Sequence, residues 1–398
     1  MRFPEFHGEW EKCKLGDIAT LTKGSGISKD QRSATGTPCI LYGELYTTYK
    51  SEVIDYVVSK TDISDKNLVR SCANDIIIPS SGETAIDIST ARCVLSPDVL
   101  LGGDLNIIRL NDGDGRFFSY QLNGVRKHDI AKIAQGVSVV HLYGESIKGL
   151  TVSFPSNKEQ QKISTLLSLI DERIATQSKL IEKLESLIKG LEDNLLDNPL
   201  WKKTYLRSFM QFFSTNSLSW EQLSYEEGEI RNLHYGLIHG FLTRGINSAS
   251  LPMIKNEVIP KQYTLCQVGD VAFADASEDT GEIAKSVEFV DTIEGDTICG
   301  LHTIHGRDIK NRTVVGFKGF AFNSRYFHNQ IKRLAQGTKV FSITANNLSS
   351  CYVYLPDLET QKAIVNLLKT YEAKLLVSKR LLEHYEKQKQ YLLRQMFI

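Results

Sequence analysis

The chain has 398 residues, and 47 lysines and arginines balance 47 aspartates and glutamates, so its formal net charge is zero. This balance excludes a polycation that holds nucleic acid by charge density alone, and the length allows two or three domains with substantial cores. Seven widely spaced cysteines without a CxxC pair predict reduced thiols, not a disulfide framework or a zinc ribbon. No apolar run is long enough for a membrane span, so we expect a cytoplasmic protein.

The first globular part, residues 1–155, is expected to be rich in strands. A helix is expected over residues 116–134. Short apolar and β-branched runs, bounded by turns that contain glycine and aspartate, predict strands at 37–41, 53–58, 75–78, 106–110 and 137–141. Strands and a helix in one segment predict an α+β lobe.

A long helix is expected next, over residues 156–199. Apolar residues recur there at alternating spacings of four and three, which is the heptad pattern of a coiled coil. At ~1.5 Å per residue, a helix of ~40 residues is ~60 Å long and requires a partner helix. The predicted helix-pairing seam contains Ile163, Leu167, Ile170, Ile174, Gln177, Ile181 and Leu184.

The second half of the chain follows the same plan. A globular part over residues 200–355 contains candidate strands at 271–273, 287–290, 313–317 and 352–355, and a candidate helix at 324–334. A second long helix is expected over residues 356–398. Its predicted seam contains Ile364, Leu368, Tyr371, Leu375, Ser378 and Leu382.

The two halves are related by an internal repeat. Ala134-Gln135-Gly136 recurs 201 residues later as Ala335-Gln336-Gly337, while the earlier Tyr42-Gly43 recurs after 193 residues as Tyr235-Gly236. Matches in one order, with a steadily growing offset, indicate a duplicated domain. The predicted fold is therefore α+β: two duplicated sheet-rich lobes joined by a pair of long antiparallel coiled-coil helices, with pseudo-two-fold symmetry.

Under this symmetry the polar seam residues Gln177 and Ser378 lie close to the point where the helices cross. Two interpretations remain open. A polar layer there can fix the register of the two helices at some cost in stability. Alternatively, polar residues are tolerated there because the helices diverge.

The sequence offers no convincing catalytic or metal-binding motif. The chain has no Gly-Lys dipeptide and hence no P-loop. Asn198-Pro199 is similar to the adenine-gripping loop of amino-methyltransferases, but it lies where the first long helix is expected to end, and no cofactor loop precedes it. His302 and His305 are three residues apart in an expected strand or loop, and a hydrogen-bonding or packing role is preferred over a metal site.

Locally placed charge favours contact with DNA. From Arg307 to Lys339 there are eight basic residues and one acidic residue, with phenylalanine and tyrosine interleaved. A second basic segment, residues 23–32, is polar and rich in glycine, as in loops that approach phosphates with backbone N–H groups. A basic run is often only a solvated surface, but two similar lobes on a spacer suit a linear target with two parts.

Several segments in this order resemble specificity subunits of type I restriction–modification systems. They are the opening around Trp10, the Tyr42-Gly43-Glu44-Leu45-Tyr46-Thr47 segment and the two Ala-Gln-Gly repeats. Two further segments, residues 154–163 and their echo at 355–364, lead into the long helices. The resemblance covers essentially the whole chain. Each motif is weak alone, and the set, present twice in the same order, is specific.

The resemblance implies two target-recognition domains, each of which reads one half of an asymmetric, bipartite double-stranded DNA site. It implies that the helix pair sets the spacing and binds two modification subunits, which carry S-adenosylmethionine and methylate adenine at N6. Restriction subunits would add translocation and cleavage driven by Mg-ATP, and this chain would be non-catalytic and hold no cofactor or metal. The implied boundaries are 1–155 and 200–355 for the recognition domains, and 156–199 and 356–398 for the helices.

The two lobes diverge strongly, so DNA-binding residues can be assigned by placement only. In the first lobe the candidates are Lys23, Ser25, Ser28, Lys29, Arg32, Tyr42, Glu44 and Ser81. In the second lobe they are His239, Arg244, Asn247, Lys285, His302 and Lys339. The alternative hypothesis is a diverged, non-catalytic scaffold whose two lobes bind partner proteins without reading DNA sequence.

Overall fold

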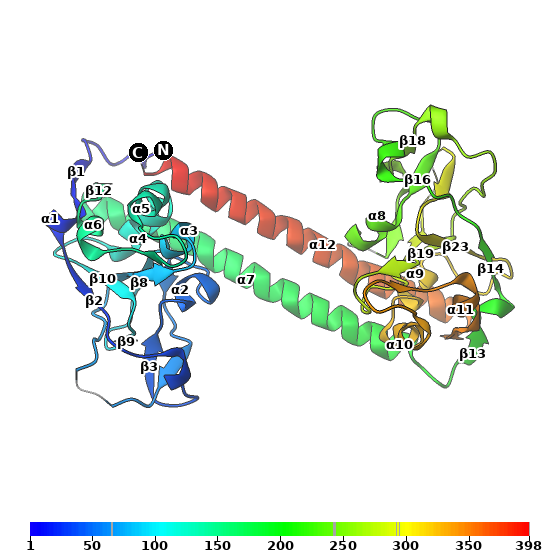
Figure 1. The fold of residues 1–398 in the computed structure, drawn as a ribbon, viewed down its shortest axis with the longest axis horizontal. Coiled ribbons are helices and arrows are strands. Elements are labelled where there is room, and N and C mark those ends of the chain that lie inside the picture. The colour runs from blue at the N-terminus through cyan, green and yellow to red at the C-terminus, as the bar shows by residue number, and fades with distance from the viewer. Residues whose placement is uncertain (65–66, 242–243, 292, 294, 398) are drawn as a thin grey trace. The chain divides into compact units, whose positions relative to one another are not determined.

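The computed structural model describes residues 1–64, 67–241, 244–291, 293 and 295–397. Its contacts divide the chain into two units (Figure 1). Unit 1 comprises Met1–Ser178 together with Arg380–Ile398, and unit 2 comprises Lys179–Lys379. Both ends of the chain therefore belong to unit 1.

Unit 1 is built around a five-stranded sheet. Its strands lie in the order β2 (Ala19–Lys23), β10 (Leu105–Leu110), β6 (Asp75–Pro79), β8 (Arg92–Val94) and β4 (Val53–Ile54). Only β4 and β8 pair in parallel. Side chains alternate across the central strand: Ile76 and Ile78 enter one apolar core, and Ile77 enters another. Burial on both faces explains why this strand is apolar throughout its centre.

Smaller elements complete unit 1. The short sheets are β5 (Ser59–Thr61), β3 (Thr37–Ile40) and β9 (Leu100–Leu101); β1 (Glu11–Lys14) and β12 (Thr151–Phe154); and β7 (Ser81–Gly82) and β11 (Val140–His141). The short helices are α1 (Leu15–Ile18), α2 (Glu44–Thr47), α3 (Ala85–Ile88), α4 (Gly115–Asn123), α5 (Lys127–Ile133), α6 (Gly144–Lys148) and the 3-10 helix η1 (Lys29–Gln31).

The single helix predicted over residues 116–134 is wrong, because the structure has two helices there, α4 and α5, with a break at Gly124. A Cβ atom on Gly124 would lie 3.2 Å from the carbonyl oxygen of Leu393, so the C-terminal segment of the chain packs closely against this break. Glycine both weakens the helix and leaves room for that approach.

Unit 2 repeats this topology. Its five-stranded sheet has the order β14 (Met210–Phe213), β23 (Thr303–Asp308), β19 (Val271–Ala274), β21 (Ser286–Phe289) and β17 (Gly245–Ile246), again with one parallel pair at the edge. A four-stranded sheet has the order β15 (Leu223–Ser224), β18 (Met253–Ile254), β16 (Arg231–Leu233) and β22 (Thr297–Cys299).

The remaining elements of unit 2 are short. The paired strands are β13 (Lys202–Tyr205) with β25 (Tyr352–Leu355) and β20 (Ala276–Ser277) with β24 (Phe341–Ser342). The helices are α8 (Tyr235–Gly240), α9 (Phe317–Ala321), α10 (Arg325–Leu334), α11 (Ala345–Ser350), and the 3-10 helices η2 (Leu206–Ser208), η3 (Trp220–Gln222), η4 (Ser248–Ser250) and η5 (Asn256–Val258).

The repeat extends to buried polar contacts. In unit 1, Arg109 donates two hydrogen bonds to the carboxylate of Asp75, at 2.8 and 2.7 Å. In unit 2, Arg307 donates the same pair to Asp270, also at 2.8 and 2.7 Å. The same strand order and the same bidentate pair in both units confirm the duplicated α+β fold.

One predicted strand of unit 2 is wrong. Residues 313–316 form a loop and Phe317 begins α9, because the carboxylate of Asp308 accepts hydrogen bonds from the backbone N–H groups of Lys310 and Thr313 and turns the chain. Gly316 then adopts a φ of 96°, and α9 begins at the next residue. A strand cannot continue through a left-handed residue of this kind.

Two long helices follow the lobes in sequence, α7 (Asn157–Leu196) and α12 (Leu358–Gln395). The start of α7 is fixed by Gln160, which accepts from the N–H of Asp114 at 3.0 Å and donates to the carbonyl of Pro155 at 2.8 Å. Gln361 makes the two equivalent contacts at the start of α12. Among the described residues, no helix combines the length and apolar character needed to cross a bilayer.

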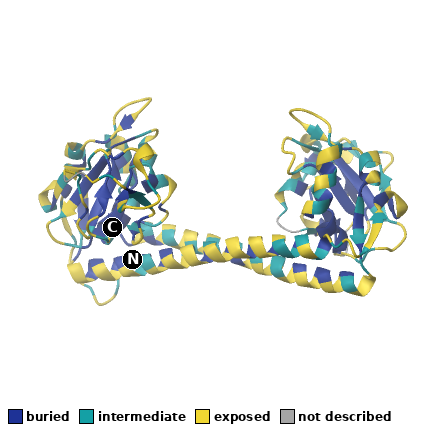
Figure 2. Ribbon diagram, turned by 90° about the horizontal axis from the view of Figure 1, so that it is seen from below, coloured by how far each residue is buried: buried dark blue, intermediate teal, exposed yellow. Residues whose placement is uncertain are grey.

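Within each unit, segments of the two helices lie side by side in antiparallel directions. In unit 1, Lys389 of α12 contacts Asp171 of α7 at 2.6 Å; in unit 2, Lys379 contacts Glu185 at 2.7 Å. Figure 2 shows buried positions interspersed with exposed ones along both helices. Every residue of the predicted seam is buried or half-buried, including the two polar ones, Gln177 in unit 1 and Ser378 in unit 2.

A buried cation holds the lobe of unit 1 to both helix segments. The ammonium of Lys389 contacts the carboxylates of Glu52, beside β4, and of Asp171 in α7. Tyr120 of α4 donates its hydroxyl proton to the same Asp171, at 2.7 Å. Burial opposes the charge, but the two carboxylates outweigh it and raise the pKa of Lys389.

Unit 2 has the equivalent cluster with its charges redistributed. Arg244 occupies the position of Glu52. Each residue directly precedes the edge strand that pairs in parallel, β17 or β4. The backbone carbonyl of each residue accepts a hydrogen bond from the neighbouring strand, β21 or β8. Its guanidinium lies 3.8 Å from Glu192 of α7, and its backbone N–H donates to Glu372 of α12 at 3.2 Å. Burial raises the pKa of Glu192 to about 7, and Arg244 only partly offsets this.

We predict that Lys389→Met destabilises unit 1 by about 3–5 kcal/mol, because it leaves two buried carboxylates without their cation. The measurement is urea-induced unfolding at pH 7. The matched control is Lys387→Met, since Lys387 is also on α12 but 67% exposed in an ion pair with Glu383. That control should change stability by less than ~0.5 kcal/mol. Equal effects of the two substitutions would contradict the proposed role of Lys389.

We also predict a pH-dependent gain from Glu192→Gln. Because its folded pKa is raised, Glu192 lowers stability progressively as pH rises from ~4.5 to ~7. Glutamine cannot ionise, so the variant does not lose this stability. The free energy of unfolding of the variant minus that of the wild type should therefore increase by roughly 2–3 kcal/mol between pH 4.5 and pH 8. Thermal unfolding at the two pH values measures this. A difference between variant and wild type that does not change with pH would be incompatible with a raised pKa.

Candidate nucleic-acid interface

A cavity of about 810 Å³ opens in unit 1 between the loop before β3 and the start of α2. Five of the eight residues predicted for this lobe line it: Ser28, Lys29, Arg32, Tyr42 and Glu44. The remaining lining residues are Gly26, Ile27, Gln31, Leu41, Gly43, Thr47, Thr48, Gly103 and Asp104. Nine of the fourteen lining residues carry polar or charged side chains and three are glycines, which suits contact with a polar ligand.

The loop at this cavity is held by its own side chains. The Gln31 amide oxygen accepts from the Ser28 N–H at 2.8 Å, which closes the single turn of η1. Lys29 begins this turn, Arg32 follows it, and both are exposed. Gly24 permits the loop to sit here, because a Cβ atom on it would lie 2.0 Å from the carbonyl oxygen of Gly102.

Glu44 has internal partners. It is 6% exposed, and its carboxylate accepts hydrogen bonds from the N–H of Leu41, at 2.9 Å, and from the hydroxyl of Ser59. Arg32 lies 3.6 Å away. These contacts fix the start of α2, so the carboxylate anchors the cavity wall and orients Arg32.

The other three candidates of unit 1 are not among the residues that line the cavity. Lys23 is exposed at the end of β2. Ser25 is half-buried, and its hydroxyl accepts from the N–H of Val69 at 2.8 Å. Ser81 is buried in β7, where it pairs with His141. The hydroxyl of Ser25 and the backbone of Ser81 therefore serve the fold.

Unit 2 presents the same framework with different side chains. Gln222 accepts from the N–H of Ser219 at 2.9 Å and closes η3 as Gln31 closes η1. Tyr235 and Gly236 follow β16 as Tyr42 and Gly43 follow β3. The residue after the capping serine is Trp220 in unit 2, at the position of Lys29.

An aromatic cluster occupies this face of unit 2. The ring centroids of Trp220 and His234 are 4.4 Å apart, and those of His234 and Tyr235 are 4.7 Å apart, each pair at 35°. His302 packs edge-on against Tyr235 at 5.3 Å. Trp220 is 46% exposed, and burial lowers the pKa of His234, which favours a neutral ring in the stack. Sequence reasoning found His302 but missed the other three, although aligning Ser28 with Ser219 would have indicated Trp220.

The predicted residues of unit 2 are scattered. His239 and Lys285 both contact Glu282, at 3.2 and 3.0 Å. Lys285 also lines a charged cavity of about 470 Å³ with Arg244, near the two long helices. His302 contacts Asp275 at 3.0 Å. The two remaining candidates are Asn247, which accepts from the N–H of Ala249 at 2.8 Å, and Lys339, which is exposed in the loop before β24.

The basic and aromatic run from 307 to 339 does not form one surface, which corrects the expectation drawn from its composition. Arg307 is paired with Asp270, and Lys318 is 2% exposed and lies 2.9 Å from Glu288. Four of the aromatic residues are buried in the core of unit 2: Phe317, Phe320, Phe322 and Phe327. The sequence from 307 to 339 therefore contains residues of a buried helix–sheet interface as well as exposed basic residues. The exposed basic residues are Lys310, Arg312, Arg325, Lys332, Arg333 and Lys339.

Comparisons with known proteins match most of the chain. A protein-family model described as type I restriction modification DNA specificity domain matches residues 7–186 and 300–386. The type I restriction enzyme MjaVIII specificity subunit of Methanocaldococcus jannaschii is 22% identical, over 97% of this chain and 93% of that protein. A putative type I restriction enzyme MjaX specificity subunit of the same organism is 24% identical, over 97% and 92%.

Solved structures share the fold. The S subunit of a type I restriction–modification system from M. genitalium aligns with a TM-score of 0.64 at 17% identity, over 100% of this chain and 99% of that one. A chain from a structural study of complex assembly and conformational transition in a type I R–M system aligns with a TM-score of 0.56 at 13% identity, over 98% and 97%. Because the family model matches more than half of the chain, the chain belongs to the family of type I restriction–modification specificity subunits, which are non-catalytic DNA-recognition subunits.

Proposed function

We propose that each unit reads one half of an asymmetric, bipartite double-stranded DNA site, and that the two sequences read are different. The observation that carries this proposal is one framework with two sets of side chains. The Ser–Gln turn and the Tyr-Gly pair recur in both units, but Lys29 is replaced by Trp220 and Glu44 by Leu237. A shared backbone that presents different chemistry suits two targets of the same shape and different sequence.

We further propose that residues 1–155 and 200–355 are the two recognition domains and that α7 and α12 set the distance between the half-sites. With 40 and 38 residues, each helix is about 60 Å long, which exceeds the ~34 Å of one duplex turn. The exposed positions of both helices are available to bind two modification subunits. The study of complex assembly that yielded one structural relative supports such partners.

In this proposal the chemistry resides on the partners. The modification subunits carry S-adenosylmethionine and methylate adenine at N6, and the restriction subunits use Mg-ATP. The candidate DNA contacts of this chain are the residues at the two equivalent faces, with Lys29, Arg32 and Tyr42 in unit 1 and Trp220, Tyr235 and His302 in unit 2. The remaining candidates stay predictions with a lower priority, because several have internal partners.

Genome-wide mapping of N6-methyladenine tests the proposal. A strain that expresses this chain with its modification subunit should carry a split methylation motif, and a strain without this chain should lose it. The motif gives both half-sites at once. If methylation is unchanged when the chain is removed, a scaffold that binds partner proteins without reading DNA becomes the better explanation.

Two substitutions should separate the half-sites. We predict that Trp220→Ala lowers discrimination in one half-site and Lys29→Ala lowers binding through the other, because the two residues hold equivalent places in different units. The loss from Trp220→Ala should be about 1–3 kcal/mol for each base pair that it helps to read.

The measurement is methylation of a DNA library with both half-sites randomised, by the complex with the modification subunits. Each variant serves as the matched control for the other. The two-domain proposal predicts that each change alters one half of the motif and leaves the other intact. Variants that alter both halves together, or neither half, would argue against it.

A further inference from the structure

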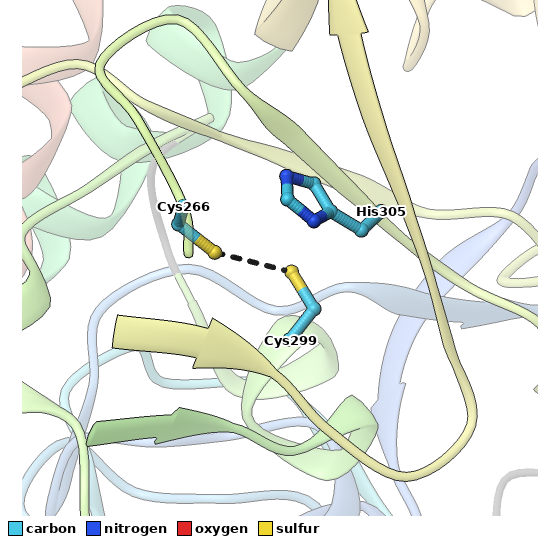
Figure 3. Close-up of side chains that lie close together, drawn as sticks. All are labelled: Cys266, Cys299 and His305. Atoms are coloured by element: carbon cyan, nitrogen blue, oxygen red, sulfur yellow. Dashed lines mark hydrogen bonds between the residues drawn. The ribbon is translucent and has the colours of Figure 1, made fainter. Parts of the chain in front are cut away.

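Three metal-ligand side chains meet in the interior of unit 2. The ligand atoms of Cys266, Cys299 and His305 all lie within 4.8 Å of one another, and all three residues are buried (Figure 3). The residues come from three separate segments: the approach to β19, the end of β22 and the middle of β23. Cys299 and His305 are only six residues apart, but Cys266 lies 33 residues before Cys299, so the three ligands do not form a compact sequence motif.

The distances suit a zinc ion. The two sulfur atoms are 3.6 Å apart, far longer than the ~2.05 Å of a disulfide bond. Two thiolates bound to one tetrahedral zinc at ~2.3 Å each lie about 3.8 Å apart. The separation in this structure therefore corresponds closely to an edge of a zinc coordination tetrahedron.

The histidine is oriented as a ligand. Its Nε2 contacts the carboxylate of Asp270 at 2.7 Å, and Arg307 donates two hydrogen bonds to the same carboxylate. With a proton on Nε2 held by Asp270, the lone pair of Nδ1 remains for a metal. A carboxylate behind the histidine is the common arrangement in zinc sites, where it fixes the tautomer and the ring orientation. Figure 3 shows the ring beside the two sulfur atoms.

The site has room for a fourth ligand. A small cavity of about 40 Å³ is lined by Cys299 and His305 and by polar residues that include Thr215 and Asn216. This volume accommodates one water molecule, whose share of liquid volume is about 30 Å³. Three protein ligands and one water complete a tetrahedral shell.

The duplicated unit shows that the fold does not require these donors. The N–H of Gly102 donates to the carbonyl of Ile40, and the N–H of Gly300 donates to the carbonyl of Leu233 in the same way. Gly102 therefore matches Gly300, and the residues before them, Leu101 and Cys299, match each other. The matching Asp–Arg pairs extend this alignment. Arg109 matches Arg307, so Ile107, two residues earlier, matches His305. Asp75 matches Asp270, so Ser71, four residues earlier, matches Cys266. Leu101 and Ile107 are fully buried in one apolar cluster of unit 1. Unit 2 thus places Cys299 and His305 where unit 1 packs aliphatic side chains, and Cys266 where unit 1 has Ser71.

We propose that Cys266, Cys299 and His305 bind one zinc ion, with water from the adjacent cavity as the fourth ligand. Both thiols lose a proton to solvent on binding, so the two thiolates neutralise the ion, while Asp270 and Arg307 neutralise each other. Cys299 belongs to the four-stranded sheet and His305 to the five-stranded sheet, so the ion cross-links the two sheets of unit 2. The short turn between these ligands carries His302, which the cross-link holds against Tyr235.

The test is the metal content of the full-length chain, purified without chelators under reducing conditions. We expect about one zinc per chain, and close to none in the double variant Cys266→Ser with Cys299→Ser. Cys351→Ala is the matched control, because Cys351 is also a buried thiol of unit 2 but lies outside the cluster. Cys72→Ser provides an exposed control. Both controls should keep the zinc.

Two further readouts keep the proposal falsifiable if a variant fails to fold. Wild-type chain reconstituted with cobalt should show thiolate-to-metal charge-transfer absorption, and a chelator should lower its thermal unfolding temperature. A wild-type chain that contains no zinc and gives no cobalt–thiolate absorption would overturn the proposal. So would recovery of Cys266 and Cys299 as a disulfide under the reducing conditions, or zinc retained at full stoichiometry in the double variant.

Discussion

One cation ties each lobe to two helix segments that lie far apart in sequence. In unit 1 the cation is Lys389, which reaches Glu52 of the lobe and Asp171 of the other helix. Behind it, Leu392, Met396 and Phe397 enter the apolar core that also holds Phe117 and Phe118. Residues 392–397 thus contribute to the core of unit 1, although most of that unit lies near the other end of the sequence.

The equivalent cluster of unit 2 contains the same charges on different elements. Its cation, Arg244, belongs to the lobe, and both helices contribute acids, Glu192 and Glu372. A helix end placed against the wrong lobe would bring Lys389 towards Arg244, or Glu192 towards Glu52, and would bury like charges. The charge distribution therefore supports one pairing of helix ends with lobes, at the cost of an acid in unit 2 whose pKa is raised by burial.

Comparison of the two copies distinguishes the contacts that stabilise each lobe from the side chains that each lobe exposes. The Asp–Arg pairs, the glutamines at the helix starts and the Ser–Gln turns recur in both copies because they satisfy backbone and carboxylate groups common to both. Side chains on the equivalent faces differ, with Lys29 and Arg32 in one unit and stacked Trp220, His234 and Tyr235 in the other. This division is what a protein needs if it reads two different sequences with one scaffold.

The sequence by itself determined the duplication, the α+β lobes and the two long helices, because heptad spacing, proline positions and repeated motifs are local signals. It did not determine the break at Gly124, which the approach of Leu393 explains, or the loop at 313–316, where the carboxylate of Asp308 turns the chain. It also misjudged the basic run from 307, since only the tertiary structure shows that Arg307 and Lys318 are paired with acids and that the phenylalanines are core. The cluster of Cys266, Cys299 and His305 was hidden for the same physical reason: partners that meet across sheets leave no periodic trace along the chain.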